Sequence, residues 1–138
     1  MAHEEGRISI NRPIEVVYEF LVDGMNNPRW RRTVTDIKPV PGKLGTYKQG
    51  MKGPGGRIDG DYEITELKLN ESIAMRAIAG MVRPTSTFKV ETEGEATVVT
   101  WILHFEGKGP AKLMDPLVST VMRGEIANLP NLKTCLES

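Results

Sequence analysis

One carboxylate in the C-terminal part of the chain could do chemistry, because Glu125 interrupts a stripe of apolar side chains at helical spacing. On a helix that turns about 100° per residue, it shares a face with Val118, Val121, Met122 and Leu129. An unpaired carboxylate there is unfavourable, so it must find a donor, take up a proton, or meet solvent or ligand in a cavity. We therefore expect Glu125 to be the polar anchor of a cavity, its acid or base, or the structural partner of a nearby Arg or Tyr.

Two aromatic side chains and one amide are expected to point toward the same interior. Strand alternation turns Tyr62 and Trp101 inward, which would offer a hydroxyl and an indole N–H to a ligand. Plain core packing is the alternative for both side chains, and it is the favoured explanation of Trp101. Tyr62, Gln49 and Glu125 would orient the polar end of a ligand. If a reaction occurs, Glu125 and Tyr62 are the candidate catalytic residues.

Other chemical motifs are weak in this sequence. His3, His104 and Cys135 are far apart in the chain and predict no metal site, with His3 in a frayed end and His104 on an outer face. The glycine-rich residues 53–56 lack the Lys-Ser/Thr of a phosphate loop and predict a hairpin turn. No Gly-x-Ser-x-Gly elbow or Cys/His pairing indicates a covalent nucleophile. We expect no cofactor and no metal.

Length favours a single domain, and the charge balance gives no indication of binding to nucleic acid or to a lipid surface. The 138 residues are most simply a single domain over residues 1–138. Lys+Arg and Asp+Glu are both 18, so no basic excess points to nucleic acid, and no apolar run approaches the ~18 residues of an inserted span. The polar N-terminus lacks a signal peptide core, and the single cysteine suits a reducing compartment. A cytoplasmic location is expected.

The residues 112–138 predict one long amphipathic helix that closes the sequence. Its apolar residues recur in steps of three and four: Met114, Leu117, Val118, Val121, Met122, Ile126, Leu129, Leu132 and Leu136. Pro130 should kink or break this helix because it removes the hydrogen bond to Ile126.

The N-terminal segment predicts a short strand over residues 7–10 and then a helix. Asn11 is expected to cap the helix and Pro13 to sit in its first turn. Trp30 is expected to pack that helix against the sheet. Asp23-Gly24 would end the helix, and residues 26–28 would form a loop.

The middle of the chain predicts an antiparallel meander rather than βαβ units. Tight-turn residues separate six short strands, over residues 33–40, 46–51, 57–67, 73–79, 85–93 and 96–106. Alternation makes one face apolar and the other charged, with Asp59, Asp61 and Arg76 on the charged side. The residues expected to line a ligand cavity are Tyr47, Gln49, Met51, Tyr62, Met75, Phe88, Val90, Trp101, Leu103, Met114, Val118, Val121, Met122 and Glu125.

Several short stretches carry a resemblance that covers almost the whole chain. They are Ile-Asn-Arg-Pro-Ile-Glu-Val-Val-Tyr-Glu-Phe-Leu at 10–21, Pro-Arg-Trp at 28–30, Gly-Thr at 45–46, Gly-Glu-Ala-Thr at 94–97 and Asn-Leu-Lys-Thr-Cys-Leu-Glu at 131–137. With the order of elements, they resemble the START-like, helix-grip superfamily, in its polyketide cyclase/dehydrase and lipid-transport branch. The resemblance implies an α+β fold whose curved sheet grips the C-terminal helix around a hydrophobic ligand. Its members include carriers, sensors and cyclases, so it implies a cavity rather than one activity.

The predicted function is non-covalent binding of a small hydrophobic or amphipathic molecule, as a carrier or sensor. Two alternatives stay open. One is a cyclase/dehydratase-like enzyme acting on a polyketide-like or other aromatic precursor, with one acid/base group. The other is an interaction module with a filled core, which would leave no pocket above about 300 Å³.

Overall fold

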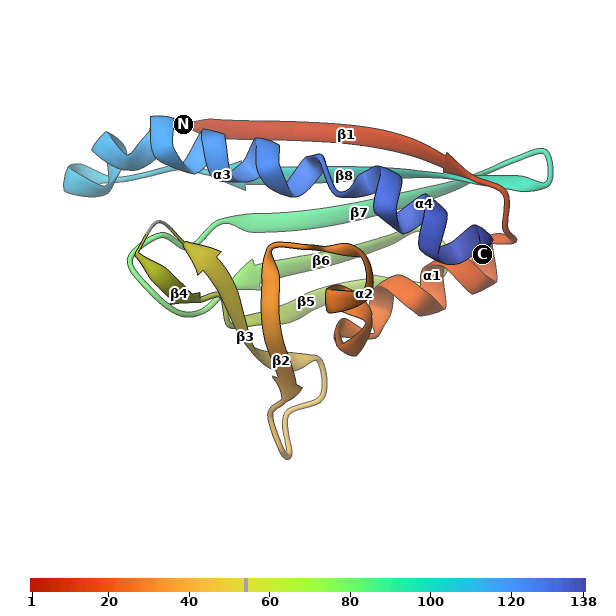
Figure 1. Ribbon diagram of the computed structural model, residues 1–138, viewed down its shortest axis with the longest axis horizontal. Helices are drawn as coiled ribbons and strands as arrows, with labels where there is room; N and C mark the ends of the chain where they lie inside the picture. The colour runs from red at the N-terminus through yellow and green to blue at the C-terminus, as the bar shows by residue number, and fades with distance from the viewer. Residues whose placement is uncertain (54) are drawn as a thin grey trace.

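A single curled sheet and a C-terminal helical layer make up the molecule (Figure 1). The computed structural model describes residues 1–53 and 55–138. A short N-terminal helix closes one end of the space between sheet and helices. This arrangement confirms the predicted α+β, helix-grip architecture.

Within these residues, eight strands form one antiparallel sheet. They are β1 (Ala2–Ile10), β2 (Val34–Pro39), β3 (Thr46–Gly53), β4 (Gly56–Asp59), β5 (Tyr62–Lys68), β6 (Ser72–Ala77), β7 (Thr85–Glu93) and β8 (Ala96–Phe105). Their order across the sheet is β1-β8-β7-β6-β5-β3-β2, and β4 pairs with β3 beside this path. The first and last strands pair along their whole lengths, from Ala2 opposite Phe105 to Ile10 opposite Thr97.

The helical segments begin at prolines in several places. They are α1 (Ile14–Val22), the 3₁₀ turn η1 (Gly24–Asn26), α2 (Asn27–Trp30), the 3₁₀ segment η2 (Gly109–Met114), α3 (Asp115–Ile126) and α4 (Leu129–Glu137). Pro28, Pro110, Pro116 and Pro130 lie in the first turns of α2, η2, α3 and α4. The absent N–H of proline is tolerated there, since first-turn amides have no intrahelical partner.

The C-terminal helices pack closely on β1 because that strand contains a glycine. A Cβ added at Gly6 would come within 2.5 Å of the Ile126 Cγ2 atom. Any larger residue would push α3 away from the sheet. Gly6 therefore sets the distance between β1 and the end of α3.

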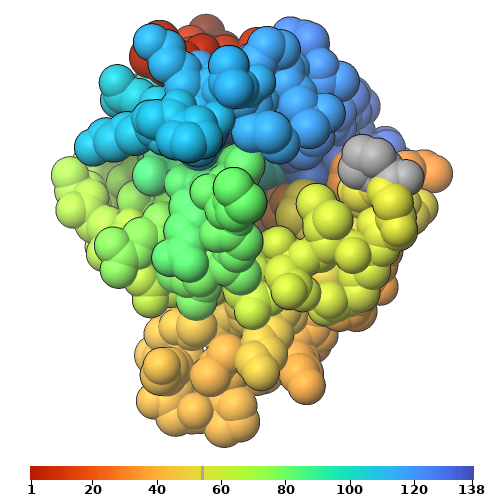
Figure 2. Space-filling view, turned by 90° about the vertical axis from the view of Figure 1, so that its left-hand side faces the viewer, coloured from red at the N-terminus to blue at the C-terminus, as the bar shows by residue number. Residues whose placement is uncertain are grey.

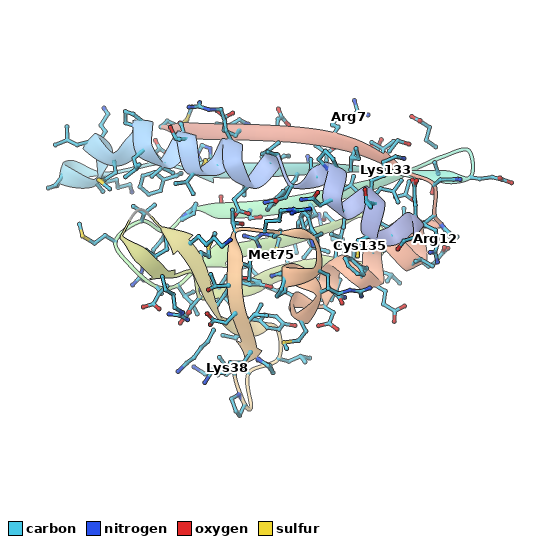
Figure 3. All side chains as sticks on the ribbon, in the orientation of Figure 1. Arg7, Arg12, Lys38, Met75, Lys133 and Cys135 are labelled. Carbon is cyan, nitrogen blue, oxygen red and sulfur yellow. The ribbon has the colours of Figure 1, made fainter. Side chains whose placement is uncertain are left out.

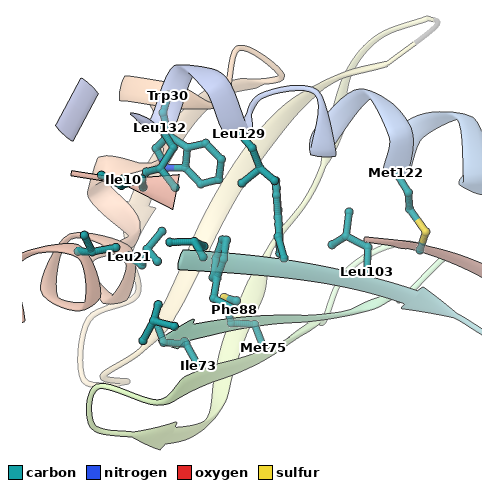
Figure 4. Packing of buried hydrophobic residues seen from close by; sticks show 14 of the residues in the cluster. Ile10, Leu21, Trp30, Ile73, Met75, Phe88, Leu103, Met122, Leu129 and Leu132 are labelled. Atoms are coloured by element: carbon teal, nitrogen blue, oxygen red, sulfur yellow. The ribbon is translucent and has the colours of Figure 1, made fainter. Parts of the chain in front are cut away.

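The hydrophobic core lies on the concave face of the sheet, beneath α1, α2 and α4. In Figure 4, Trp30, Leu129 and Leu132 face Phe88 and other side chains of the sheet. The Trp30 ring centroid lies 6.0 Å from that of Phe88 and 5.2 Å from that of Trp101. Trp30 thus packs a helix against the sheet as predicted, although the helix is α2 rather than α1.

Three N-terminal predictions are wrong in detail. The first strand begins at Ala2 rather than Arg7, since Glu4 and Gly6 on its inner side hide the apolar alternation. Asn11 does not cap α1, whose N-cap position is Pro13 without a side-chain hydrogen bond. The backbone N–H of Asn11 instead donates to Glu137 Oε2 at 2.7 Å. The expected loop over residues 26–28 is helical, as η1 and α2.

Two longer elements are interrupted where the sequence predicts continuity. The strand expected over 57–67 is split at residues 60–61 into β4 and β5, because β4 pairs with β3 over one stretch and β5 with β3 over another. The helix expected over 112–138 begins as the 3₁₀ segment η2 and breaks at residues 127–128. This break confirms the prediction from Pro130. No helix in the described part of the chain is long and apolar enough to cross a membrane.

Candidate functional site

A cavity of about 380 Å³ lies between the concave face of the sheet and α3. Its opening is visible as a hollow in the face shown in Figure 2. Small-molecule sites commonly enclose about 300–1,000 Å³ behind mostly apolar walls with a few polar groups. The interior is therefore not filled, and the volume is at the lower end of that range.

The structure brings together nearly all the residues that the sequence assigns to a ligand cavity. The walls include Gln49, Met51, Tyr62, Met75, Phe88, Trp101, Leu103, Met114, Val118, Val121, Met122 and Glu125. In Figure 3, the labelled Met75 lies within the fold, whereas Arg7 and Lys38 lie at its periphery. That these side chains contact a ligand stays a prediction.

Two predicted lining residues lie elsewhere. Val90 is buried in the core, outside the cavity wall. Tyr47 stands behind Tyr62, with its ring centroid 5.3 Å away in a stacked arrangement. Both follow the predicted alternation. The sheet curls, however, so that these inner-face positions lie beyond the cavity wall.

Glu125 has protein partners for both of its oxygens. Arg31 donates from Nε to Oε2 at 2.8 Å, and Thr33 donates from Oγ1 to Oε1 at 2.5 Å. Both ionic side chains are shielded from solvent, with relative exposures of 12% for Arg31 and 5% for Glu125. A buried carboxylate needs such partners, and their absence would cost several kcal/mol. The predicted structural partner is therefore present, and Glu125 also forms part of the cavity wall.

Arg31 places the positive charge of this pair at the cavity surface. Its guanidinium carbon lies 5.3 Å from the ring centroid of Trp101, which favours a cation over the ring face. Only Nε donates to Glu125. Among the described residues, neither Nη1 nor Nη2 of Arg31 has a hydrogen-bond acceptor, although Arg31 lines the cavity. The terminal N–H groups can therefore meet an oxygen atom of a ligand.

The indole of Trp101 is already used by the protein. Its Nε1–H donates to the Ser86 hydroxyl at 2.8 Å. Phe88 stacks on Trp101 with ring centroids 5.0 Å apart. Trp101 is therefore a wall of the cavity, and the expectation that its N–H points at a ligand is wrong in this structure.

A second polar cluster surrounds the Tyr62 hydroxyl. Asn27 donates from Nδ2 to this hydroxyl at 3.0 Å and to Gln49 Oε1 at 2.9 Å. The backbone of Gln49 is held by Asp61, because the Gln49 N–H donates to Asp61 Oδ1 at 3.0 Å. Burial raises the pKa of Tyr62 to about 12, against smaller lowering contributions from Asn27 and the Arg31 charge. Tyr62 is thus a neutral hydroxyl at physiological pH, able to donate a hydrogen bond but not to act as a base.

A glycine is required beside this cluster. Gly24 donates its N–H to the Tyr47 hydroxyl at 3.2 Å. A Cβ at Gly24 would collide with the Tyr62 hydroxyl and lie 2.9 Å from the Tyr47 ring. The two tyrosines therefore keep their positions only because residue 24 has no side chain.

Two residues assigned to the outer, charged face reach the rim of the cavity. Asp59 pairs with Arg57, from Oδ1 to Nη1 at 2.8 Å, and Arg76 pairs with Glu63, from Nη2 to Oε1 at 2.5 Å. Both residues border the cavity, but their side chains are 65% and 61% exposed and are held in ion pairs on the outer face. The predicted alternation is therefore confirmed for Asp59 and Arg76.

The two histidines are neighbours in space. His3 and His104 are cross-strand partners in β1 and β8, with their Nδ1 atoms 3.4 Å apart. The expectation of a frayed end at His3 is wrong, because the β1–β8 pairing extends to Ala2. Among the described residues, no group of three or more His, Cys, Asp or Glu side chains is arranged to hold a metal ion.

Sequence reasoning missed Arg31 and Asn27, which supply the donors of the two polar clusters. Both lie in the segment around α2, where apolar periodicity is absent. The expectation that Glu125 needs a donor was the available signal. It could not identify which arginine supplies that donor.

Comparisons with known proteins agree with this geometry. The family model described as polyketide cyclase / dehydrase and lipid transport matches residues 1–137. A START superfamily protein from Mycobacterium smegmatis is similar in structure, with a TM-score of 0.80 and 14% identity, over 99% of this chain and 98% of that chain. A protein from Thermus thermophilus is similar at a TM-score of 0.76 and 20% identity, over 97% of this chain and 96% of that chain.

An enzyme is also among the similar structures. The Zhui aromatase/cyclase from Streptomyces sp. R1128 has a TM-score of 0.76 and 16% identity, over 98% of this chain and 93% of that chain. At such identities the likeness shows a shared fold alone. A search of curated protein sequences finds no significant match.

Proposed function

Since the chain belongs to the polyketide cyclase/dehydrase and lipid transport family, we propose that it binds a small amphipathic molecule non-covalently between the sheet and α3. The apolar body of the ligand lies against the methionine, leucine and aromatic side chains of the walls. Burial of that surface drives binding, at roughly 25 cal/mol per Å² before ordering costs.

The observation that supports this proposal best is the position of Arg31. Its Nη1 and Nη2 groups lie at an apolar cavity without acceptors among the described residues, while Glu125 fixes Nε. A carbonyl oxygen of the ligand satisfies those donors without adding charge, since Arg31 and Glu125 already neutralise each other. A carboxylate oxygen also satisfies them, but it adds one negative charge to the cavity. The ligand class is therefore an apolar molecule with one oxygen-bearing end.

Thermal unfolding with matched ligand pairs tests this proposal. Each pair shares one apolar body, and only one member carries a carboxylate or carbonyl group. A ligand at 100 times its dissociation constant adds about 2.7 kcal/mol to the free energy of unfolding. We expect the oxygen-bearing member to bind more tightly to the natural chain, and native mass spectrometry to detect it at one copy per chain.

The control is the double variant Arg31→Gln/Glu125→Gln, which removes both charges and leaves neither partner unpaired. It should bind the two members of each pair about equally. If the natural chain shows no preference between them, Arg31 does not recognise the ligand. If no member of a broad apolar panel binds, the proposed function is wrong.

An enzyme of the cyclase/dehydratase type is the second candidate. Glu125 and Tyr62 both line the cavity, and the Tyr62 hydroxyl stays protonated at neutral pH, so it could act as a hydrogen-bond donor to a developing oxyanion. Turnover of a polyketide-like substrate that is lost in Tyr62→Phe, with substrate binding retained, would favour this function over simple binding.

A further inference from the structure

Exposed apolar side chains gather around the mouth of the cavity. Met81 and Leu113 protrude farthest, with relative exposures of 84% and 85%. Four further exposed apolar side chains also line the cavity itself: Ile58, Met114, Leu117 and Val121. They come from β4, the β6–β7 loop, η2 and α3, which surround the hollow in Figure 2. This group, called the apolar collar below, is a contiguous feature rather than a scatter of single residues.

Basic side chains are interleaved with the apolar collar. The segments that form it, residues 51–53, 55–59, 79–84 and 106–121, contain the carboxylates Asp59, Glu106 and Asp115. Two of these carboxylates form ion pairs: Asp59 pairs with Arg57, and Asp115 pairs with the N-terminal ammonium group. The same segments contain Lys52, Arg57, Arg83, Lys108 and Lys112. Apart from Arg57, these cations form no ion pair with any described residue.

An acidic hairpin lies at the opposite end of the molecule. The β7–β8 hairpin, at the far right of Figure 1, exposes Glu91, Glu93 and Glu95. Lys89, Arg12 and Lys133 also lie toward that end, so the hairpin is acidic but the end as a whole is mixed in charge. An anionic surface would therefore attract the basic segments of the mouth and repel the hairpin.

We infer that the apolar collar docks on the surface of an anionic lipid bilayer. Met81 and Leu113 enter the boundary between headgroups and acyl chains, and the surrounding lysines and arginines meet lipid phosphates and carboxylates. A second copy fits this surface less well, because a symmetric contact would bring the two basic rims together. Docking in this orientation opens the cavity directly toward the bilayer, so an amphipathic molecule can pass between them without crossing water.

Vesicle flotation of the full chain, with no ligand added, tests the inference. We expect binding to phosphatidylcholine vesicles that contain about 30 mol% phosphatidylserine, weaker binding to pure phosphatidylcholine, and release as salt is raised. Leu113→Asp and Met81→Asp should each reduce the fraction bound by about tenfold, because a carboxylate is repelled from an anionic interface.

Matched controls separate the collar from general adsorption. Leu44 is fully exposed in the β2–β3 turn, far from the mouth, so Leu44→Asp makes the same chemical change elsewhere and should leave binding unchanged. Likewise, Arg83→Glu/Lys112→Glu should abolish binding, while Lys38→Glu/Lys43→Glu, on β2 and the β2–β3 turn, should reduce it much less.

Three results would overturn the inference. They are no binding to anionic vesicles, equal loss in Leu113→Asp and Leu44→Asp, and a self-association in sedimentation velocity that Leu113→Asp abolishes. The last would assign the collar to a second copy of the chain. Because no ligand is present in flotation, failure here leaves the proposed ligand-binding function standing, and failure of the ligand panel leaves docking standing.

Discussion

Arg31 and Glu125 are 94 residues apart in the chain, yet Arg31 Nε lies 2.8 Å from Glu125 Oε2 inside the fold. A second contact reinforces the same junction, since the backbone N–H of Arg32 donates to Asn128 Oδ1 at 3.2 Å. Together they fasten the segment after α2 to the region where α3 ends. The ion pair therefore shapes the cavity and holds its two walls together.

Removing one partner of this pair should destabilise the fold strongly. Arg31→Gln leaves the Glu125 carboxylate buried with only Thr33 as donor, and we expect a loss of about 3 kcal/mol in the free energy of unfolding. Chemical denaturation at pH 7 measures the loss. The double variant Arg31→Gln/Glu125→Gln should recover at least half of it. Equal losses in both variants would mean that the charge imbalance is not the cause.

Adding a methyl group beside the tyrosine pair should disturb it. Gly24→Ala forces the Tyr62 hydroxyl and the Tyr47 ring to move, and we expect a loss of about 1–3 kcal/mol by chemical denaturation. Gly124→Ala is the matched control, since a Cβ there meets open space within α3. It should instead stabilise the chain by about 0.5–1 kcal/mol, through helix propensity. If Gly24→Ala left the free energy of unfolding unchanged, the two tyrosines would be free to move aside.

High pH should weaken the fold through Tyr62. Burial raises its pKa from 10.0 in the unfolded chain to about 12 in the folded one, so the folded state binds this proton more tightly. The contribution of protonated Tyr62 to the free energy of unfolding is complete below pH 10. It is lost as the pH rises toward about 12, and its size is on the order of 2 kcal/mol. Carbon-13 NMR of the tyrosine Cζ atoms measures each ionisation separately. Titration of Tyr62 at or below about pH 10 would contradict its burial.

Two leucines of the C-terminal helices should respond differently to truncation. Leu132 is fully buried in the core, so Leu132→Ala should cost about 2–5 kcal/mol in the free energy of unfolding. Leu117 is half exposed at the cavity mouth, so Leu117→Ala should change it by no more than about 0.5 kcal/mol. For the affinity of any ligand found by native mass spectrometry the order should be the opposite, with Leu117→Ala weakening binding more than Leu132→Ala. A large stability loss in Leu117→Ala would place it in the core.

Local pattern was sufficient to predict the layers and most of the cavity wall. Alternation in β8 correctly placed Trp101 and Leu103 on the buried face, and helical spacing correctly placed Val118 and Met122 toward the sheet. Side-chain direction follows from backbone period, which a sequence displays directly. The faces of strands and helices are therefore predictable before any contact is known.

Long-range partners could not be predicted in this way. Nothing near Arg31 in the sequence indicates that it meets Glu125, because the meeting depends on how far the sheet curls. The same is true of His3 and His104, which pair only because β1 returns to the edge of β8. Curvature arises from the summed twist and irregularities of several strands, such as the register shift between Ile64 and Glu66.

The pairing of β1 with β8 has a consequence for biosynthesis. Residues 2–10 are synthesised long before their partner strand, which ends only at Phe105. At about 5–20 residues per second, β1 waits roughly 5–20 s for β8, with its backbone amides and carbonyls unpaired. During that interval it can pair with another nascent chain, so chaperones that shield emerging segments should affect the yield of this protein more than they affect a helical bundle of the same length.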